Sequence, residues 1–135
     1  MSTAQAAPER AVLVIDDDDV TLATYAAALR VEGYEIVTCR SSATALQAAE
    51  ARAFAVILID LRLPTADDGL ALLRRIRSLP EHRTTPLAIV TGEYEIDRRV
   101  EAEIAKHNAA IAFKPMWLPE LVSLVKQLDP AIPEG

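Results

Sequence analysis

The sequence predicts a doubly wound α/β fold, because five short apolar runs alternate with five segments of helical periodicity. Strands that alternate with helices form a parallel sheet, and right-handed crossovers place helices on both of its faces. Four runs are continuous, which is typical of strands covered on both faces, whereas the second is mixed and indicates a sheet edge. The runs are Ala11–Ile15, Tyr34–Thr38, Ala55–Ile59, Pro86–Val90 and Ala109–Phe113.

Each helical segment carries a start signal, a stop signal or an apolar stripe. Val20–Glu32 is rich in Ala and Leu and is followed by Gly33, a residue suited to a helix C-terminus. Ser42–Arg52 opens with a hydroxyl residue that can cap a helix. The other three are recognised by apolar stripes, which are Leu70, Leu73, Ile76 and Leu79 before Pro80, then Ile96, Val100 and Ile104, then Leu121, Leu124, Val125 and Leu128 after Pro119.

Length and composition indicate one globular domain. The chain has 135 residues, of which 51% are hydrophobic and 25% charged. We expect a folded unit over residues 10–129, with flexible tails at 1–9 and 130–135. No apolar run is long enough to span a membrane, and a single Cys39 fits a reducing compartment, so we expect a soluble, cytoplasmic protein. A net charge of -6 argues against nucleic acid as a partner.

Carboxylates gather at the predicted carboxyl edge of the sheet. Asp16, Asp17, Asp18 and Asp19 follow the first strand, and Asp60 follows the third. One of Asp18 and Asp19 is expected to cap the next helix, and a lone Asp60 could be a turn residue or a helix cap. Three carboxylates that converge on one point repel each other unless a cation joins them. Hard oxygen ligands at an open site suit Mg²⁺.

Thr91 and Lys114 end the fourth and fifth strands. Each has an ordinary explanation, since a β-branched residue favours strands and a lysine reaches solvent from an apolar surface. Together with the acids they form a set of groups that can receive a phosphoryl group. A carboxylate can attack phosphorus and form an acyl phosphate, a metal ion can neutralise the phosphoryl oxygens, and a hydroxyl and an ammonium can hold the remaining oxygens.

These residues stand in four motifs, in one order, along about residues 10–129. The motifs are Val14-Ile15-Asp16-Asp17-Asp18, Ile59-Asp60-Leu61-Arg62-Leu63-Pro64 with Asp68-Gly69, Val90-Thr91-Gly92, and Phe113-Lys114-Pro115. In them the chain resembles the receiver domain of two-component response regulators. The resemblance implies a flavodoxin-like (βα)5 fold with strand order 2-1-3-4-5. The segment Leu61–Pro64 is similar to receivers that are appended to hybrid sensor kinases.

The resemblance also implies a role for individual residues. Asp60 would be the phosphoacceptor, and Thr91 and Lys114 would bind the phosphoryl group. The implied Mg²⁺ ligands are Asp16, Asp17, Asp60 and the backbone carbonyl of Arg62. The implied positions that tune the phosphoryl lifetime are Arg62 and Glu93, and a cis peptide bond is implied before Pro115.

The partners implied by the resemblance are proteins. A histidine kinase or a histidine phosphotransfer protein would donate the phosphoryl group, and a downstream protein would bind the face of the fourth helix, fifth strand and fifth helix. Phosphorylation-dependent homodimerisation is a further option. The chain would be a phosphoacceptor rather than an enzyme with a separate substrate, although it could catalyse its own phosphorylation and dephosphorylation.

Two features depart from the family pattern. The loop from Asp60 to Gly69 is one residue longer than the commonest spacing, with Thr65-Ala66-Asp67 as the extension. Ile111 stands at the switch position, three residues before the lysine, where the family often has Tyr or Phe. Because isoleucine is stiff at χ1, we expect the segment from Gly92 into the fourth helix to move instead.

Two other functions remain as alternatives. A Mg²⁺-dependent phosphatase with an Asp nucleophile usually has a second acid two residues later, where this chain has Arg62. A degenerate receiver would bind partners without phosphate, and Ile111 keeps that option open. The remaining polar residues are interpreted as structural: packing for Cys39, no site role for His82 and His107, and solvated helix faces for Arg74, Arg75 and Arg77 and for Arg98 and Arg99.

Overall fold

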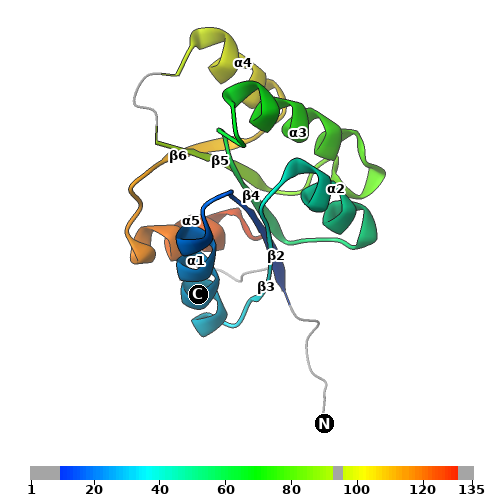
Figure 1. The fold of residues 1–135 in the computed structure, drawn as a ribbon. Coiled ribbons are helices and arrows are strands. Elements are labelled where there is room, and N and C mark those ends of the chain that lie inside the picture. The colour runs from blue at the N-terminus through cyan, green and yellow to red at the C-terminus, as the bar shows by residue number, and fades with distance from the viewer. Residues whose placement is uncertain (1–9, 93–95, 131–135) are drawn as a thin grey trace.

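The structure is a computed structural model that describes residues 10–92 and 96–130 (Figure 1). The tails expected at 1–9 and 130–135 lie outside the described residues, apart from Pro130. Glu93 also lies outside them.

Five strands form one parallel sheet in the order β3-β2-β4-β5-β6, which confirms the order 2-1-3-4-5. The mixed strand β3 lies at one edge, as predicted. The other edge is β6, whose residues are half-buried or exposed, so the prediction that this strand is covered on both faces was wrong. An edge strand has a neighbour on one side alone, and a continuous apolar run does not reveal that. The strands are β2 (Ala11–Ile15), β3 (Glu35–Cys39), β4 (Val56–Asp60), β5 (Leu87–Thr91) and β6 (Ala110–Phe113).

Helices cover both faces of the sheet (Figure 1). One apolar cluster lies between the sheet and the pair α1 and α5, and the other lies between the sheet and α2, α3 and α4. No described helix combines the length and the apolar character needed to cross a membrane. The helices are α1 (Asp19–Val31), α2 (Ser42–Ala51), α3 (Ala66–Ser78), α4 (Arg98–Lys106) and α5 (Leu118–Leu128), with a short 3₁₀ helix η1 (Pro80–His82).

Helix α3 begins earlier than the sequence indicates, at Ala66. The Thr65 hydroxyl accepts a hydrogen bond from the Asp68 backbone N–H at 3.3 Å, and the Asp68 carboxylate accepts one from the Thr65 N–H at 3.2 Å. This reciprocal cap satisfies two N–H groups that a helix start leaves free. Residues expected to extend a loop therefore form the first turn of α3. Helix α4, in contrast, begins at Arg98, after Ile96.

The prediction that Arg77 lies on a solvated face was wrong. Its guanidinium donates to the backbone carbonyl oxygens of His82 at 2.9 Å, Thr85 at 2.6 Å and His107 at 2.8 Å. These bonds fasten the end of α3 to η1 and to the end of α4. The structural interpretation of His82 holds, since it is fully buried and lies 2.8 Å from the Ala49 carbonyl oxygen.

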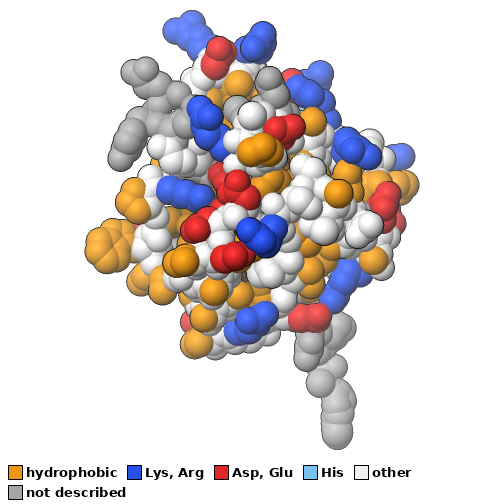
Figure 2. All heavy atoms as spheres, viewed as in Figure 1, with side chains coloured by type: hydrophobic (Ala, Val, Ile, Leu, Met, Phe, Trp, Pro, Cys, Tyr) orange, Lys and Arg blue, Asp and Glu red, His pale blue; other side chains and the backbone are white. Residues whose placement is uncertain are grey.

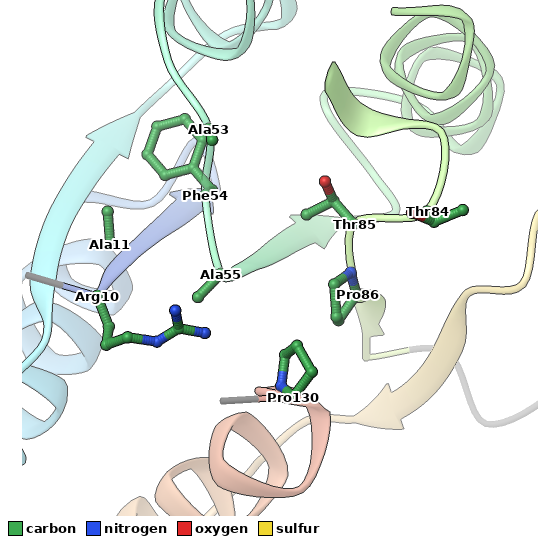
Figure 3. A pocket seen from close by; sticks show the side chains of 9 residues that line it. All are labelled: Arg10, Ala11, Ala53, Phe54, Ala55, Thr84, Thr85, Pro86 and Pro130. Carbon is green, nitrogen blue, oxygen red and sulfur yellow. The ribbon is translucent and has the colours of Figure 1, made fainter. Parts of the chain in front are cut away.

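A cavity of about 390 Å³ lies beside the amino ends of the strands (Figure 3). Arg10, Ala55, Pro86 and Pro130 are among the residues that line it. Ligands of doubly wound sheets bind beyond the opposite, carboxyl ends of the strands. The cavity is therefore at the wrong edge of the sheet for the predicted chemistry.

Gly69 is required by the close approach of α3 to the end of β4. A Cβ atom at this position would lie 2.1 Å from the Leu61 carbonyl oxygen, a backbone atom that no side-chain rotation can move. We therefore expect Gly69→Ala to lower the free energy of unfolding by about 3 kcal/mol, the upper range for overpacking. Gly92→Ala is the control, since nothing lies within 4 Å of its added Cβ. Urea unfolding of both variants checks this, and equal stabilities would contradict it.

Candidate functional site

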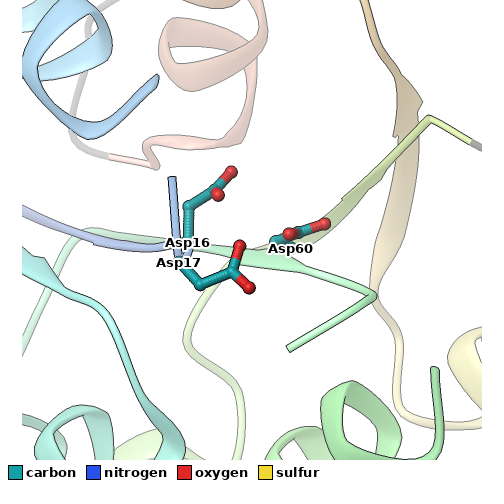
Figure 4. Close-up of side chains that lie close together, drawn as sticks. All are labelled: Asp16, Asp17 and Asp60. Carbon is teal, nitrogen blue, oxygen red and sulfur yellow. The ribbon is translucent and has the colours of Figure 1, made fainter. Parts of the chain in front are cut away.

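Three carboxylates meet at the carboxyl ends of β2 and of its neighbour β4, the central strand (Figure 4). Asp16 and Asp17 follow β2, and Asp60 is the last residue of β4. One carboxylate oxygen from each residue lies within 4.8 Å of the others. Asp16 and Asp60 are buried, whereas Asp17 is exposed. The cluster predicted from the sequence is therefore present, and it is open to solvent on one side.

The turn after β2 holds Asp16 in place and starts α1. An oxygen of the Asp16 carboxylate accepts a hydrogen bond from the Asp18 backbone N–H at 2.9 Å. Asp18 in turn caps α1, because its side chain accepts the Thr21 N–H at 3.0 Å. The Asp18 carboxylate also accepts a hydrogen bond from the Thr21 hydroxyl. This bond is the largest cause of the lowered pKa of Asp18, and the bond from the Thr21 N–H is the second. One of the two residues considered for the cap thus fills that role.

Lys114 lies against the acids. Its backbone N–H bonds the Thr91 carbonyl oxygen at 2.8 Å, which fixes the end of β6 beside β5. Its ammonium donates to an Asp16 oxygen at 2.8 Å and lies 3.8 Å from an oxygen of Asp60. The following bond to Pro115 is cis, as the sequence analysis expected, and Leu63–Pro64 is also cis, which it did not expect.

Alternation of side chains along the strands places the site residues on defined faces. Val14, Leu58 and Ala112 pack toward α1 and α5, so Asp16, Asp60 and Lys114, each two residues further on, lie on that side. Ile89 packs toward the other helices, and the buried Thr91, two residues on, ends β5 on that side. The five predicted residues thus stand at the carboxyl ends of four neighbouring strands, at one edge of the sheet. They are Asp16, Asp17, Asp60, Thr91 and Lys114.

The pKa of Asp60 is raised to about 6. Burial is the largest cause, because it penalises the charged carboxylate, and the charge of Asp16 raises the pKa further. Lys114 acts in the opposite direction. For Lys114 itself burial disfavours the ammonium, but the bond to Asp16 and the charge of Asp60 outweigh it and raise the pKa.

The donor set fits a hard divalent cation. Figure 2 shows Asp and Glu side chains gathered in the middle of this face, with Lys and Arg side chains beside them. The three site carboxylates offer oxygen atoms alone, which suits Mg²⁺ or Ca²⁺ better than zinc. Their total charge exceeds what one Lys114 can balance, so a cation at the cluster would relieve repulsion.

Of the three other predicted residues, Arg62 and Ile111 lie in the described part of the chain. Arg62 is exposed, and its backbone N–H lies 3.4 Å from an Asp60 oxygen. Ile111 is half-buried and packs with the cluster beneath α3 and α4. The lifetime role of Glu93 falls outside the described residues. Tyr25 is a buried residue of α1, and burial raises the pKa of its hydroxyl.

The raised pKa of Asp60 predicts that the free energy of unfolding depends on pH. The folded state binds this proton more tightly than the unfolded chain, whose value is 3.8, so ionised Asp60 destabilises the fold above pH 6 by up to about 3 kcal/mol. Asp60→Asn should therefore stabilise the metal-free protein at pH 8, and the gain should shrink as the pH falls through 6 toward 4. Urea unfolding in chelator across this range measures it. A gain that is the same at every pH would refute this assignment.

The sequence profile of the response regulator receiver domain matches residues 12–126. The transcriptional regulatory protein PrrA of Mycobacterium tuberculosis is 32% identical over 117 residues, which cover 87% of this chain and 48% of that protein. The chain spans about half the length of the curated relatives that it matches first.

Solved structures agree with the sequence matches. The response regulator receiver domain protein of Methanospirillum hungatei has a TM-score of 0.80 and 26% identity, covering 90% of this chain and 95% of that one. A response regulator protein of Burkholderia pseudomallei, with a phosphorylated aspartic acid, a calcium ion and citrate, has a TM-score of 0.75 and 26% identity over 87% of this chain and 66% of that one. With this fold and a profile match over nearly the whole described chain, the protein belongs to the receiver domain family of two-component response regulators.

Proposed function

We propose that this receiver domain accepts a phosphoryl group on Asp60 with the help of Mg²⁺. The observation that carries the proposal is the meeting of Asp16, Asp17 and Asp60 with Lys114 at one sheet edge. A related receiver has been solved with a phosphorylated aspartic acid and a calcium ion, which supports both the acceptor and the cation.

Asp60 supplies the attacking oxygen. One of its carboxylate oxygens bonds to phosphorus while the bond from phosphorus to the donor breaks, and an acyl phosphate results. The attack needs the ionised carboxylate, and the charge of Lys114 favours that form. Lys114 is placed to turn from Asp16 toward a phosphoryl oxygen, and the Thr91 hydroxyl is assigned as a second donor to that group.

The assigned Mg²⁺ ligands are the carboxylates of Asp16, Asp17 and Asp60 and the backbone carbonyl of Arg62. When bound, the ion supplies charge neutralisation to the phosphoryl oxygens. A phosphatase with an Asp nucleophile is less well supported, because the place of its second acid is taken by the exposed Arg62.

The partners follow from the chemistry of the family. We propose a histidine kinase or a histidine phosphotransfer protein as the donor, and a protein that binds the face of α4, β6 and α5 as the receiver of the signal. Relatives are named transcriptional regulators, and this chain spans about half their length. Transcriptional regulation is therefore a property of those relatives and is not proposed for this chain. The cytoplasmic location and the absence of nucleic acid binding stay predictions.

Labelling with a small phosphodonor tests the acceptor. We expect acetyl phosphate and Mg²⁺ to add one phosphoryl group to the wild type, and peptide mass spectrometry to place it on Asp60. Asp60→Asn should lose the label while it keeps the fold by circular dichroism. Glu50→Gln, an exposed acid of α2, is the control and should label normally. Undiminished labelling of Asp60→Asn would show that the acceptor is another residue.

The assigned cation site predicts stabilisation by Mg²⁺. A ligand that binds the native state alone adds about 1.4 kcal/mol at ten times its dissociation constant, and here it also relieves carboxylate repulsion. The melting temperature of the wild type should therefore rise with Mg²⁺ concentration. Asp17→Asn removes an exposed ligand and should abolish the rise, whereas Glu50→Gln should preserve it. A wild-type melting temperature that is unchanged by millimolar Mg²⁺ would exclude the cation site.

A further inference from the structure

Helix α1 carries an exposed seam on the side that faces away from the sheet. Val20 is 72% exposed and Val31 is 83% exposed, and Thr24 and Ala27 between them are exposed as well. These four residues recur at steps of four, three and four, so they form one continuous line along the helix. The seam is therefore a surface of α1 that nothing in the described chain covers.

The start of α5 widens the seam into an apolar groove. Leu118, the first residue of α5, lies beside α1 and is 40% exposed, and the preceding Trp117 is 77% exposed. The groove measures about 530 Å³ and is lined by Ala23, Thr24, Ala27, Ala28, Val31 and Leu118. Of the five large hydrophobic side chains that are exposed in the described residues, four belong to α1 or to this start of α5. Figure 2 shows hydrophobic side chains gathered over these two elements. Such a gathering is typical of an interaction surface.

Two opposite charges flank the seam on one side. Asp19 and Arg30 line the same groove between α1 and β3, so they lie on one flank of α1, at opposite ends of the helix. Arg40 lies 2.9 Å from one Asp19 oxygen, but both side chains are largely exposed, and a carboxylate accepts several hydrogen bonds. Arg30 makes a long bond of 3.5 Å to the Ile36 carbonyl oxygen and has further N–H donors. Both charges can therefore pair with groups of a partner.

We propose that this seam binds the same seam of a second copy of the chain, with the two α1 helices antiparallel. The seam is symmetric about its middle, because valines stand at both ends and smaller side chains stand at the centre. An antiparallel pair places Val20 against Val31 of the second copy, and Thr24 against Ala27 of the second copy. The small central side chains let the two helix axes approach closely.

The charges complete the match between the two copies. In a two-fold pair each contact is made twice, and the same flank of each helix meets the other. Asp19 therefore lies beside Arg30 of the second copy, and Arg30 beside Asp19 of the second copy. Val20 of the second copy enters the groove beside Leu118. This pairing leaves the face of α4, β6 and α5 free and needs no phosphoryl group, so the inference does not depend on the proposed function.

Sedimentation equilibrium of the unphosphorylated protein tests the inference. The average mass should rise from one chain toward two over a concentration series that reaches the millimolar range, since an interface of one helix pair is small. Ala27→Glu places two unpaired carboxylates in the seam and should weaken the association by at least about tenfold. Ala105→Glu, an exposed alanine of α4, is the matched control and should associate like the wild type.

Charge reversal tests the antiparallel orientation. Asp19→Arg and Arg30→Asp should each weaken the association, because each sets like charges side by side, and the double variant should restore it. A cooperative thermal transition checks that every variant is folded. A wild type that is monomeric at every concentration would overturn the inference and leave this face to a different protein. Association that survives Ala27→Glu, or a double variant that is no better than the single ones, would overturn it as well. Labelling of Asp60 tests the proposed function separately.

Discussion

Repulsion among three carboxylates at one edge of the sheet is the constraint on which the rest of this structure depends. Asp16, Asp17 and Asp60 are brought together because β2 and β4 are parallel neighbours that end at the same level. Lys114, at the end of the edge strand β6, balances part of their charge. A register slip of one residue would turn these side chains to the opposite face and disperse the cluster. The buried apolar strands prevent such a slip, so the core maintains an electrostatically costly site.

Helix α4, on the opposite side of the sheet from α1 and α5, is held unevenly along its length. Helix α4 buries Ile104 and half-buries Val100, so its apolar contact is thin. Its second half is nevertheless fastened to α3, since Arg74 makes two bonds to Glu103 at 2.7 and 3.2 Å. Those bonds lower the pKa of Glu103 to about 2. The segment from Gly92 into α4, which we predict to move on phosphorylation, joins the other end of this helix.

The fold could be predicted almost entirely from the sequence, because apolar runs and helix signals are local. The acid cluster could also be predicted, since parallel strands place their last residues at one edge. The features that the sequence did not predict have a common cause. Arg77 bonds three backbone carbonyls, Thr65 and Asp68 cap each other, and β6 lies at an edge. Each depends on which distant groups face a residue, and periodicity does not contain that information.

The central claim is that the three carboxylates form one electrostatic unit that a cation completes. Proton release on Mg²⁺ binding measures this directly, by titration calorimetry in buffers of different ionisation enthalpy. Because the pKa of Asp60 is about 6, the metal-free protein at pH 6 carries about half a proton there. We predict that Mg²⁺ binding expels about half a proton at pH 6 and almost none at pH 8. Binding without proton release at pH 6, or the same release from Asp60→Asn, would contradict the account.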